Sequence, residues 1–120
     1  MDAVIYTRSA RPSPERFEMQ RAVCRRMAAE YGFEVAGEFH DNGSPGRGLA
    51  QLLATVRGGE VSAVVVADFN RFGRALDAFT RVMETLDEAD VPLYVVGHGR
   101  LAADMRAALD IPREVVEHRL

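Results

Sequence analysis

The sequence predicts a three-layer α/β domain: a mostly parallel, four- to five-stranded sheet with helices on both faces. Two observations carry this prediction. Short apolar segments alternate along the chain with segments whose apolar residues recur at helical spacing, the pattern of parallel strands joined by right-handed crossovers. In addition, the segment 61–67 (VSAVVVA) is apolar almost without interruption, as expected for a central strand that is covered on both faces.

The chain opens with a predicted strand and a long predicted helix. Residues 3–8 (AVIYTR) form a short, mostly apolar strand. Ser13 is suited to cap the following helix, and Pro14 fits its first position. The helix ends at Gly32. One face of it carries four apolar residues at helical spacing: Phe17, Cys24, Met27 and Tyr31.

A second strand and a short helix follow. Residues 33–40 alternate as a strand, with Val35 and Phe39 on one face. The polar segment 41–46 (DNGSPG) has the composition of a loop. The helix after it ends at the glycine pair 58–59 and turns four apolar residues inward: Leu49, Leu52, Leu53 and Val56.

The rest of the chain repeats the alternation. Residues 74–89 form a helix with an acidic outer face, and residues 91–96 (VPLYVV) form the fourth strand. After Gly99 we expect a helical segment to the end of the chain, broken near Pro112. We expect one domain over residues 1–120, with a core over about 1–98 and a short C-terminal helical segment over 99–120.

Composition sets limits on function. The chain has 120 residues, of which 48% are hydrophobic and 28% charged, as in an ordinary globular protein. A single cysteine excludes an internal disulfide, and the three histidines lack ligand spacing, so we expect no metal and no cofactor. No segment is long and apolar enough to span a membrane, and a cytoplasmic location is expected. The net charge of −3 means that any nucleic-acid contact must come from a local cluster of arginines.

Such a cluster is predicted at the carboxyl ends of the strands, where open α/β sheets bind ligands. Because an arginine fork donates two parallel hydrogen bonds to a phosphate, this edge predicts a site for a phosphate or phosphodiester. The alternative is a set of solvated or ion-paired loop arginines. The residues expected at this edge are Arg8, Ser9, Ala10, His40, Asp41, Arg47, Asp68, Asn70, Arg71, Arg74, His98 and Arg100.

Two common α/β classes are excluded at the end of the first strand. Phosphoacceptor receiver domains need paired carboxylates there to hold magnesium, but this chain has Arg8. Dinucleotide-binding domains need a glycine-rich turn, but residues 7–11 (TRSAR) contain no glycine.

Five segments, in order, resemble the catalytic domain of the resolvase/invertase serine recombinases. Residues 5–10 (IYTRSA) are similar to its Tyr-x-Arg-x-Ser opening, and Gln20 matches a glutamine of its first helix. Residues 41–46 resemble its Asp-x-x-x-Ser-Gly loop, and residues 47–49 (RGL) resemble its Arg-x-Gly-Leu helix start. Residues 70–74 (NRFGR) resemble its Asp-Arg-x-Gly-Arg signature. The resemblance covers about four-fifths of the chain and implies the resolvase catalytic-domain fold.

The resemblance also implies phosphoryl transfer on DNA. In this family a serine hydroxyl attacks a backbone phosphodiester and forms a phosphoseryl link, while arginines stabilise the transition state without a metal. On that template Arg8, Arg47, Arg71 and Arg74 would line the phosphate. The partners that we expect are the DNA backbone and either further copies of this chain or another protein, with no membrane partner.

The departures bear on activity. Ala10 stands where the family has its serine, and a methyl group cannot attack phosphorus. Side chains alternate along a strand, so Ala10 should share a face with Arg8 while Ser9 points away. Ser9 could act as the nucleophile only if the chain slipped by one residue. Asn70 replaces the signature aspartate, which removes a candidate proton donor or arginine partner. The loop before Arg47 is also shortened.

In this family a long dimerisation helix and then a DNA-binding part follow the catalytic domain. We expect the short segment 99–120 in place of that helix and no DNA-binding part, so sequence-specific DNA recognition would need a partner. Our first hypothesis is a catalytically degenerate serine-recombinase domain that binds DNA without cutting it. The alternatives are a minimal recombinase that uses Ser9, a protein-interaction or regulatory module without DNA contact, and a decayed remnant of a mobile element. Whether the chain is an enzyme stays open at this point.

Overall fold

The structure is a computed structural model that describes residues 1–68, 71 and 76–101. Strands and helices alternate along the chain as the sequence predicts. The elements, in chain order, are β1 (Asp2–Ser9), α1 (Pro14–Glu30), β2 (Glu34–Asn42), α2 (Arg47–Arg57), β3 (Ala63–Val66), α3 (Leu76–Glu88), β4 (Leu93–Val95) and β5 (Gly99–Arg100).

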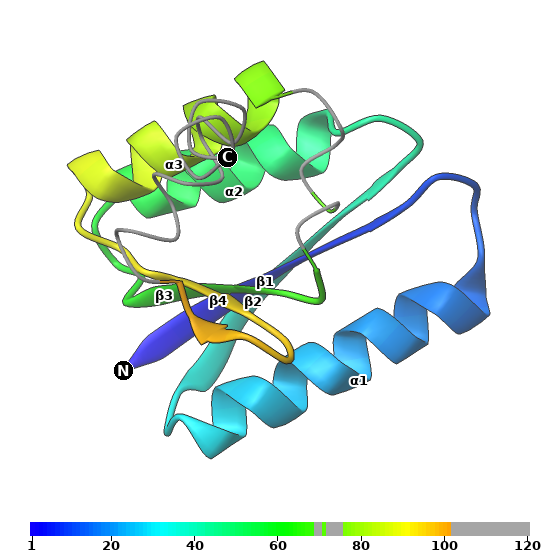
Figure 1. Ribbon diagram of the computed structural model, residues 1–120, viewed down its shortest axis with the longest axis horizontal. Helices are drawn as coiled ribbons and strands as arrows, with labels where there is room; N and C mark the ends of the chain where they lie inside the picture. The colour runs from blue at the N-terminus through cyan, green and yellow to red at the C-terminus, as the bar shows by residue number, and fades with distance from the viewer. Residues whose placement is uncertain (69–70, 72–75, 102–120) are drawn as a thin grey trace, which may run out of the picture.

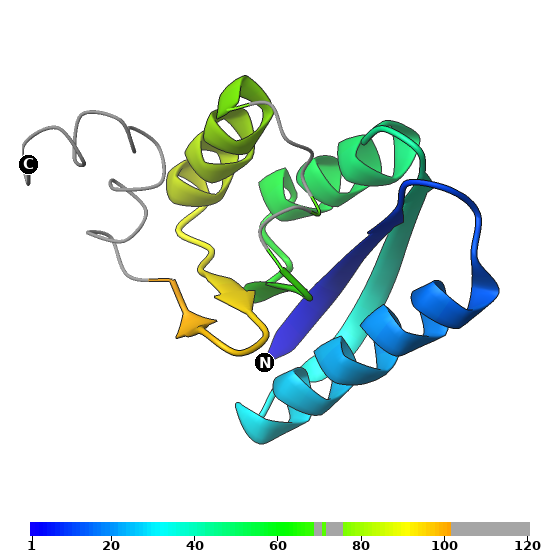
Figure 2. The ribbon, with the colours of Figure 1, turned by 45° about the vertical axis from the view of Figure 1, so that its right-hand side comes forward.

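The strands form one five-stranded sheet in the order β2-β1-β3-β4-β5. The first four strands in this order are mutually parallel, and β5 alone pairs antiparallel, with β4. Helix α1 covers one face of the sheet, while α2 and α3 lie side by side on the other (Figures 1 and 2). The predicted fold class, a three-layer α/β domain with a mostly parallel sheet, is confirmed.

The two faces of the sheet build two cores. In β1, Ala3 and Ile5 pack towards α1 with Cys24 and Met27, whereas Val4 and Tyr6 on the other face pack beneath α2 and α3. This alternation follows from the twofold period of a strand. The four residues of β3 are all buried, as expected for a central strand with a helix layer on each side.

The start of α1 follows the sequence prediction. The Ser13 hydroxyl accepts a hydrogen bond from the Arg16 backbone N–H at 3.3 Å, and Pro14 occupies the first turn. Cys24 and Met27 are buried beneath the helix, but Tyr31 lies at its end with 48% of its surface exposed.

Strand β2 differs from its predicted pattern in two ways. Ala3 pairs with Val35 but Val4 pairs with Gly37, so one extra residue bulges from β2. The bulge reverses the alternation and places Val35 and Phe39 on opposite faces, not on one. The strand also continues through Asp41 and Asn42, which we expected in a loop, because these residues pair with the end of β1.

The expectation of a helix directly after Gly99 is wrong for the residues that the structure describes. Residues 99–100 form β5, and Leu101 is buried against the core of α2 and α3. Two glycines with positive φ, Gly97 and Gly99, allow the tight turn from β4. Residues 102–120, with most of the expected C-terminal segment, lie outside the described residues, and the domain boundary stays a prediction.

Candidate functional site

The end of β1 projects beyond its neighbour β3. The pairing of the two strands stops at Tyr6 and Val66, before it reaches Arg8. The side-chain amide of Gln20 in α1 contacts the Arg8 backbone: it accepts a hydrogen bond from the Arg8 N–H at 3.1 Å and donates one to the Arg8 carbonyl at 3.0 Å. Gln20 thus supplies the backbone contacts that a further strand would make.

Arg8 and Arg71 bind each other's backbone. The Arg8 guanidinium donates from Nε to the Arg71 carbonyl at 3.1 Å and from Nη1 to the Gly43 carbonyl at 2.6 Å. In return, Nη1 of Arg71 donates to the Arg8 carbonyl. The two arginines that the sequence placed at this edge therefore meet, and they join the end of β1 to the turns after β2 and β3.

Arg71 also forms a two-point ion pair with Asp68. Its Nε lies 3.0 Å from Asp68 Oδ1, and its Nη2 lies 3.1 Å from Asp68 Oδ2. The Arg71 side chain is 18% exposed and that of Asp68 49%. The sequence places Asp68 at this edge but gives it no role. Its spacing of three residues from Arg71 is the only sequence signal of the pair.

Asp41 organises the start of α2. Its carboxylate accepts backbone N–H bonds from Gly46, Gly48 and Leu49 at 2.8–2.9 Å, and Tyr6 donates its hydroxyl at 2.9 Å. A Cβ at Gly48 would lie 2.5 Å from the His40 carbonyl oxygen, so the close approach of α2 to β2 requires glycine there.

The electrostatics of Tyr6 and Asp41 follow from these contacts. Burial acts to raise the pKa of Asp41, but the backbone hydrogen bonds outweigh it and hold the pKa below its usual range. Burial, followed by the bond to Asp41, raises the pKa of Tyr6. Asp41 is therefore an ionised helix cap, a role that the motif resemblance alone does not reveal.

Ser9 and Ala10 face opposite ways. Ser9 is 2% exposed, and its hydroxyl has no hydrogen-bond partner among the residues that the structure describes. Ala10 is exposed and lines a surface hollow with Ser13 and two arginines that the sequence analysis did not single out, Arg11 and Arg16. The outward position at the end of β1 thus carries a methyl group, and the hydroxyl next to it points into the protein.

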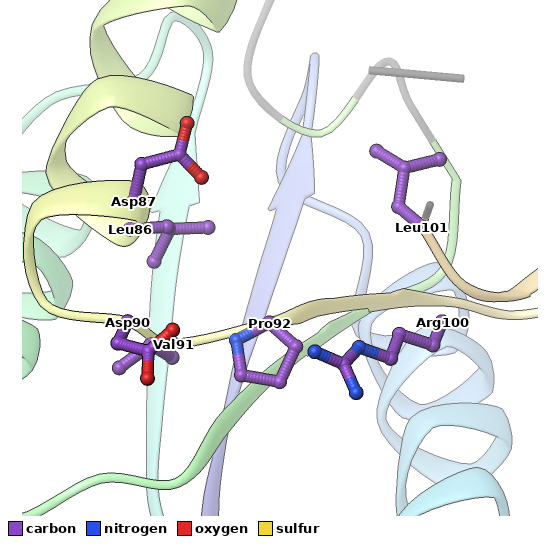
Figure 3. Close-up of a pocket in the computed structure, with 7 residues that line it drawn as sticks. All are labelled: Leu86, Asp87, Asp90, Val91, Pro92, Arg100 and Leu101. Atoms are coloured by element: carbon purple, nitrogen blue, oxygen red, sulfur yellow. The ribbon is translucent and has the colours of Figure 1, made fainter. Parts of the chain in front are cut away.

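Of the other predicted arginines, the structure describes Arg47 and Arg100, and neither forms a hydrogen bond with Arg8 or Arg71. Arg47 is exposed at the first position of α2. Arg74 and Asn70 lie outside the described residues. Because β5 runs antiparallel, Arg100 lies near Pro92, at the opposite end of β4, beside a pocket that Asp87 and Asp90 also line (Figure 3).

The described residues contain no group of three or more histidine, cysteine, aspartate or glutamate side chains placed to hold a metal ion. Within the same residues, no helix has the length and apolar character needed to cross a membrane.

Comparisons with known proteins support the resemblance of the motifs. The family model described as "Resolvase, N terminal domain" matches residues 3–113. A search of curated proteins gave no match. The fold is similar to three solved structures. A resolvase family site-specific recombinase from Streptococcus pneumoniae is 22% identical, with a TM-score of 0.78 over 99% of this chain and 89% of that one. The N-terminal catalytic domain of TP901-1 integrase is 17% identical, with a TM-score of 0.79 over 99% and 96%. The C-terminal catalytic domain of ISC1926 TnpA, an IS607-like serine recombinase, is 22% identical, with a TM-score of 0.74 over 98% and 80%.

The family model spans nearly the whole chain and includes every motif at the carboxyl edge of the sheet. The order of strands and helices agrees with these folds. The chain therefore belongs to the resolvase family, as an N-terminal catalytic domain of the serine-recombinase type.

Proposed function

We propose that this domain binds the DNA backbone through arginines at the carboxyl edge of its sheet and does not cleave the strand. The observation that carries the proposal is the pair of orientations at the end of β1. Ala10 is exposed but has no hydroxyl, whereas Ser9 has a hydroxyl but is 2% exposed. A nucleophile must reach the phosphorus atom, and neither side chain meets that condition.

The hydrogen bonds of Gln20 argue against Ser9 as a substitute nucleophile. Turning Ser9 outward requires a one-residue slip of the end of β1. Such a slip would break both bonds between the Gln20 amide and the Arg8 backbone, and also the 2.7 Å bond from the Gly43 N–H to the Ser9 carbonyl. Each buried backbone group that loses its partner costs about 1–3 kcal/mol.

The proposal predicts no covalent protein–DNA adduct. Incubation with duplex DNA, followed by a denaturing gel, should show no shifted band for the natural protein or for Ser9→Ala. An adduct in the natural protein that disappears in Ser9→Ala would establish Ser9 as the nucleophile and refute this part of the proposal.

DNA binding is tested separately. The affinity for a short DNA duplex should fall as salt rises, because phosphate contacts release counterions. Arg71→Ala should weaken binding by about three- to tenfold, in line with the loss of one charge-assisted contact. Arg26→Ala is the matched control, since Arg26 is exposed in the second half of α1, away from the end of β1. Thermal melting of each variant checks that it is folded.

A second candidate function is a protein-interaction or regulatory module that makes no contact with DNA. The net charge of −3 favours it, as does the use of the Arg8 guanidinium to bind the protein's own carbonyls. Absence of DNA binding at low salt, together with a stable complex with another protein, would support this function instead.

A further inference from the structure

Asp68 takes the side of Arg71 that is best suited to a phosphate. Arginine recognises carboxylate and phosphate groups in the same way, through two parallel N–H bonds. In Arg71 these two donors are Nε and Nη2, and both are directed at the Asp68 carboxylate, at 3.0 and 3.1 Å. A phosphate cannot take both donors while Asp68 holds them.

We propose that Asp68 is an internal competitor for DNA: it occupies the Arg71 fork until a backbone phosphate displaces it. This inference rests on the proposed function, because it assigns a control to the same arginine. Asp68 precedes the signature segment 70–74 and is not part of any motif on which the family resemblance depends.

The surroundings of the pair make displacement feasible. The Asp68 side chain is 49% exposed, so its carboxylate returns to water when it leaves Arg71. An ion pair with such an exposed partner changes an equilibrium constant by only about two- to fivefold. Arg71 itself is 18% exposed and stays anchored through its Nη1 donor to the Arg8 carbonyl, so the fork keeps its place after Asp68 departs.

The opposite role for Asp68 would be to position Arg71 for phosphate. The bond from Nη1 to the Arg8 carbonyl already provides an anchor on β1, and the Arg71 backbone is held by the Arg8 guanidinium at 3.1 Å. The two roles predict effects of opposite sign when the carboxylate is removed. A competitor lowers the affinity for phosphate, whereas a positioning residue raises it.

The test compares Asp68→Asn with the natural protein in salt titrations against duplex DNA. We expect Asp68→Asn to bind about two- to fivefold more tightly. Glu60→Gln removes the same charge from an exposed residue between α2 and β3, and it should change affinity much less. In an Arg71→Ala background, the gain from Asp68→Asn should shrink to that of Glu60→Gln, because the competed group is gone.

Three results would overturn the competitor role: weaker binding by Asp68→Asn, a gain no larger than that of Glu60→Gln, or a gain in Arg71→Ala that still exceeds that of Glu60→Gln. Asp68→Ser provides a second removal of the carboxylate, should Asp68→Asn be poorly folded. Its expected gain and its overturning results are the same.

Thermal melting with inorganic phosphate separates this inference from the proposed function. At matched ionic strength, phosphate should raise the Tm of Asp68→Asn more than that of the natural protein or Glu60→Gln. If no variant binds DNA but this difference appears, the proposed function fails, and Asp68 competes for Arg71 with free phosphate and not with DNA. If the natural protein binds DNA through Arg71 but Asp68→Asn shows neither the DNA gain nor the phosphate shift, the competitor role fails and the proposed function stands.

Discussion

Two aspartates at the same edge of the sheet have different roles. Asp41, at the end of β2, accepts three backbone N–H groups and the Tyr6 hydroxyl, all within 2.9 Å. Asp68, just beyond β3, is half exposed and faces the Arg71 guanidinium. The first contact joins a helix to a strand, and the second joins two side chains close to solvent. The donors that surround a carboxylate, and its access to water, determine its role more than its place in the fold does.

The largest difference is expected in stability. Asp41→Ala should lower the free energy of unfolding by about 2–4 kcal/mol, because it removes a helix cap and leaves partly buried donors unpaired. Asp68→Ala should cost less than about 1 kcal/mol, as is usual for an ion pair with an exposed partner. Urea unfolding of both variants measures the difference. Equal losses would show that the contrast between the two aspartates is wrong.

Gly48→Ala tests the contact between α2 and Asp41 by changing the helix instead of the carboxylate. The new Cβ would lie 2.5 Å from the His40 carbonyl oxygen, so α2 must move away from β2. We expect a loss of about 1–3 kcal/mol in unfolding free energy. A loss below about 0.5 kcal/mol would mean that α2 can shift without straining the Asp41 hydrogen bonds.

The smallest expected effect is on the thermal stability at low pH. The folded state holds the pKa of Asp41 below its usual range, so the unfolded chain takes up a proton first as the pH falls. The stability that Asp41 contributes is fully present above a pH of about 4, near the unfolded pKa, and is lost as the pH drops through the lower folded pKa. The Tm of the natural protein should therefore fall more steeply below that pH than the Tm of Asp41→Asn. If the curves of Tm against pH run parallel, Asp41 is not the cause of the steeper fall. Asp68→Asn serves as the comparison variant.

The sequence predicts the layers of this fold because the buried residues of strands and helices are apolar and recur at regular spacings. The buried run of β3 and the serine-proline start of α1 are direct consequences of packing and capping, and both are visible in the residues. The bulge in β2 has no such pattern because it depends on pairing with β1, far away in the sequence. Strand β5 has only two residues, too few to show an alternation. Arg100 was consequently placed at the wrong end of the sheet.

The candidate site shows the same limit. Motif order brought Arg8 and Arg71 to one edge, and alternation along β1 indicated that Ser9 and Ala10 face opposite ways. The hydrogen-bond partners could not be predicted, because the sequence does not show which donors surround a carboxylate. The cap at Asp41 and the two backbone bonds of Gln20 each join residues that are between 5 and 12 positions apart, across a turn or between elements. The pair of Asp68 and Arg71 is local and could have been considered from its spacing.

The cap at Asp41 also affects which anions this edge attracts. The amino end of a helix carries a partial positive charge that often holds a free phosphate. At α2 the protein's own carboxylate takes that place, as Asp68 does at Arg71. A small metabolite with a single phosphate group would have to displace one of these two carboxylates. A polymer brings many phosphates at once, and the nearby charges of Arg11, Arg16 and Arg47 are exposed to meet them. Under the proposed function, this edge would favour polyanions over small phosphate esters.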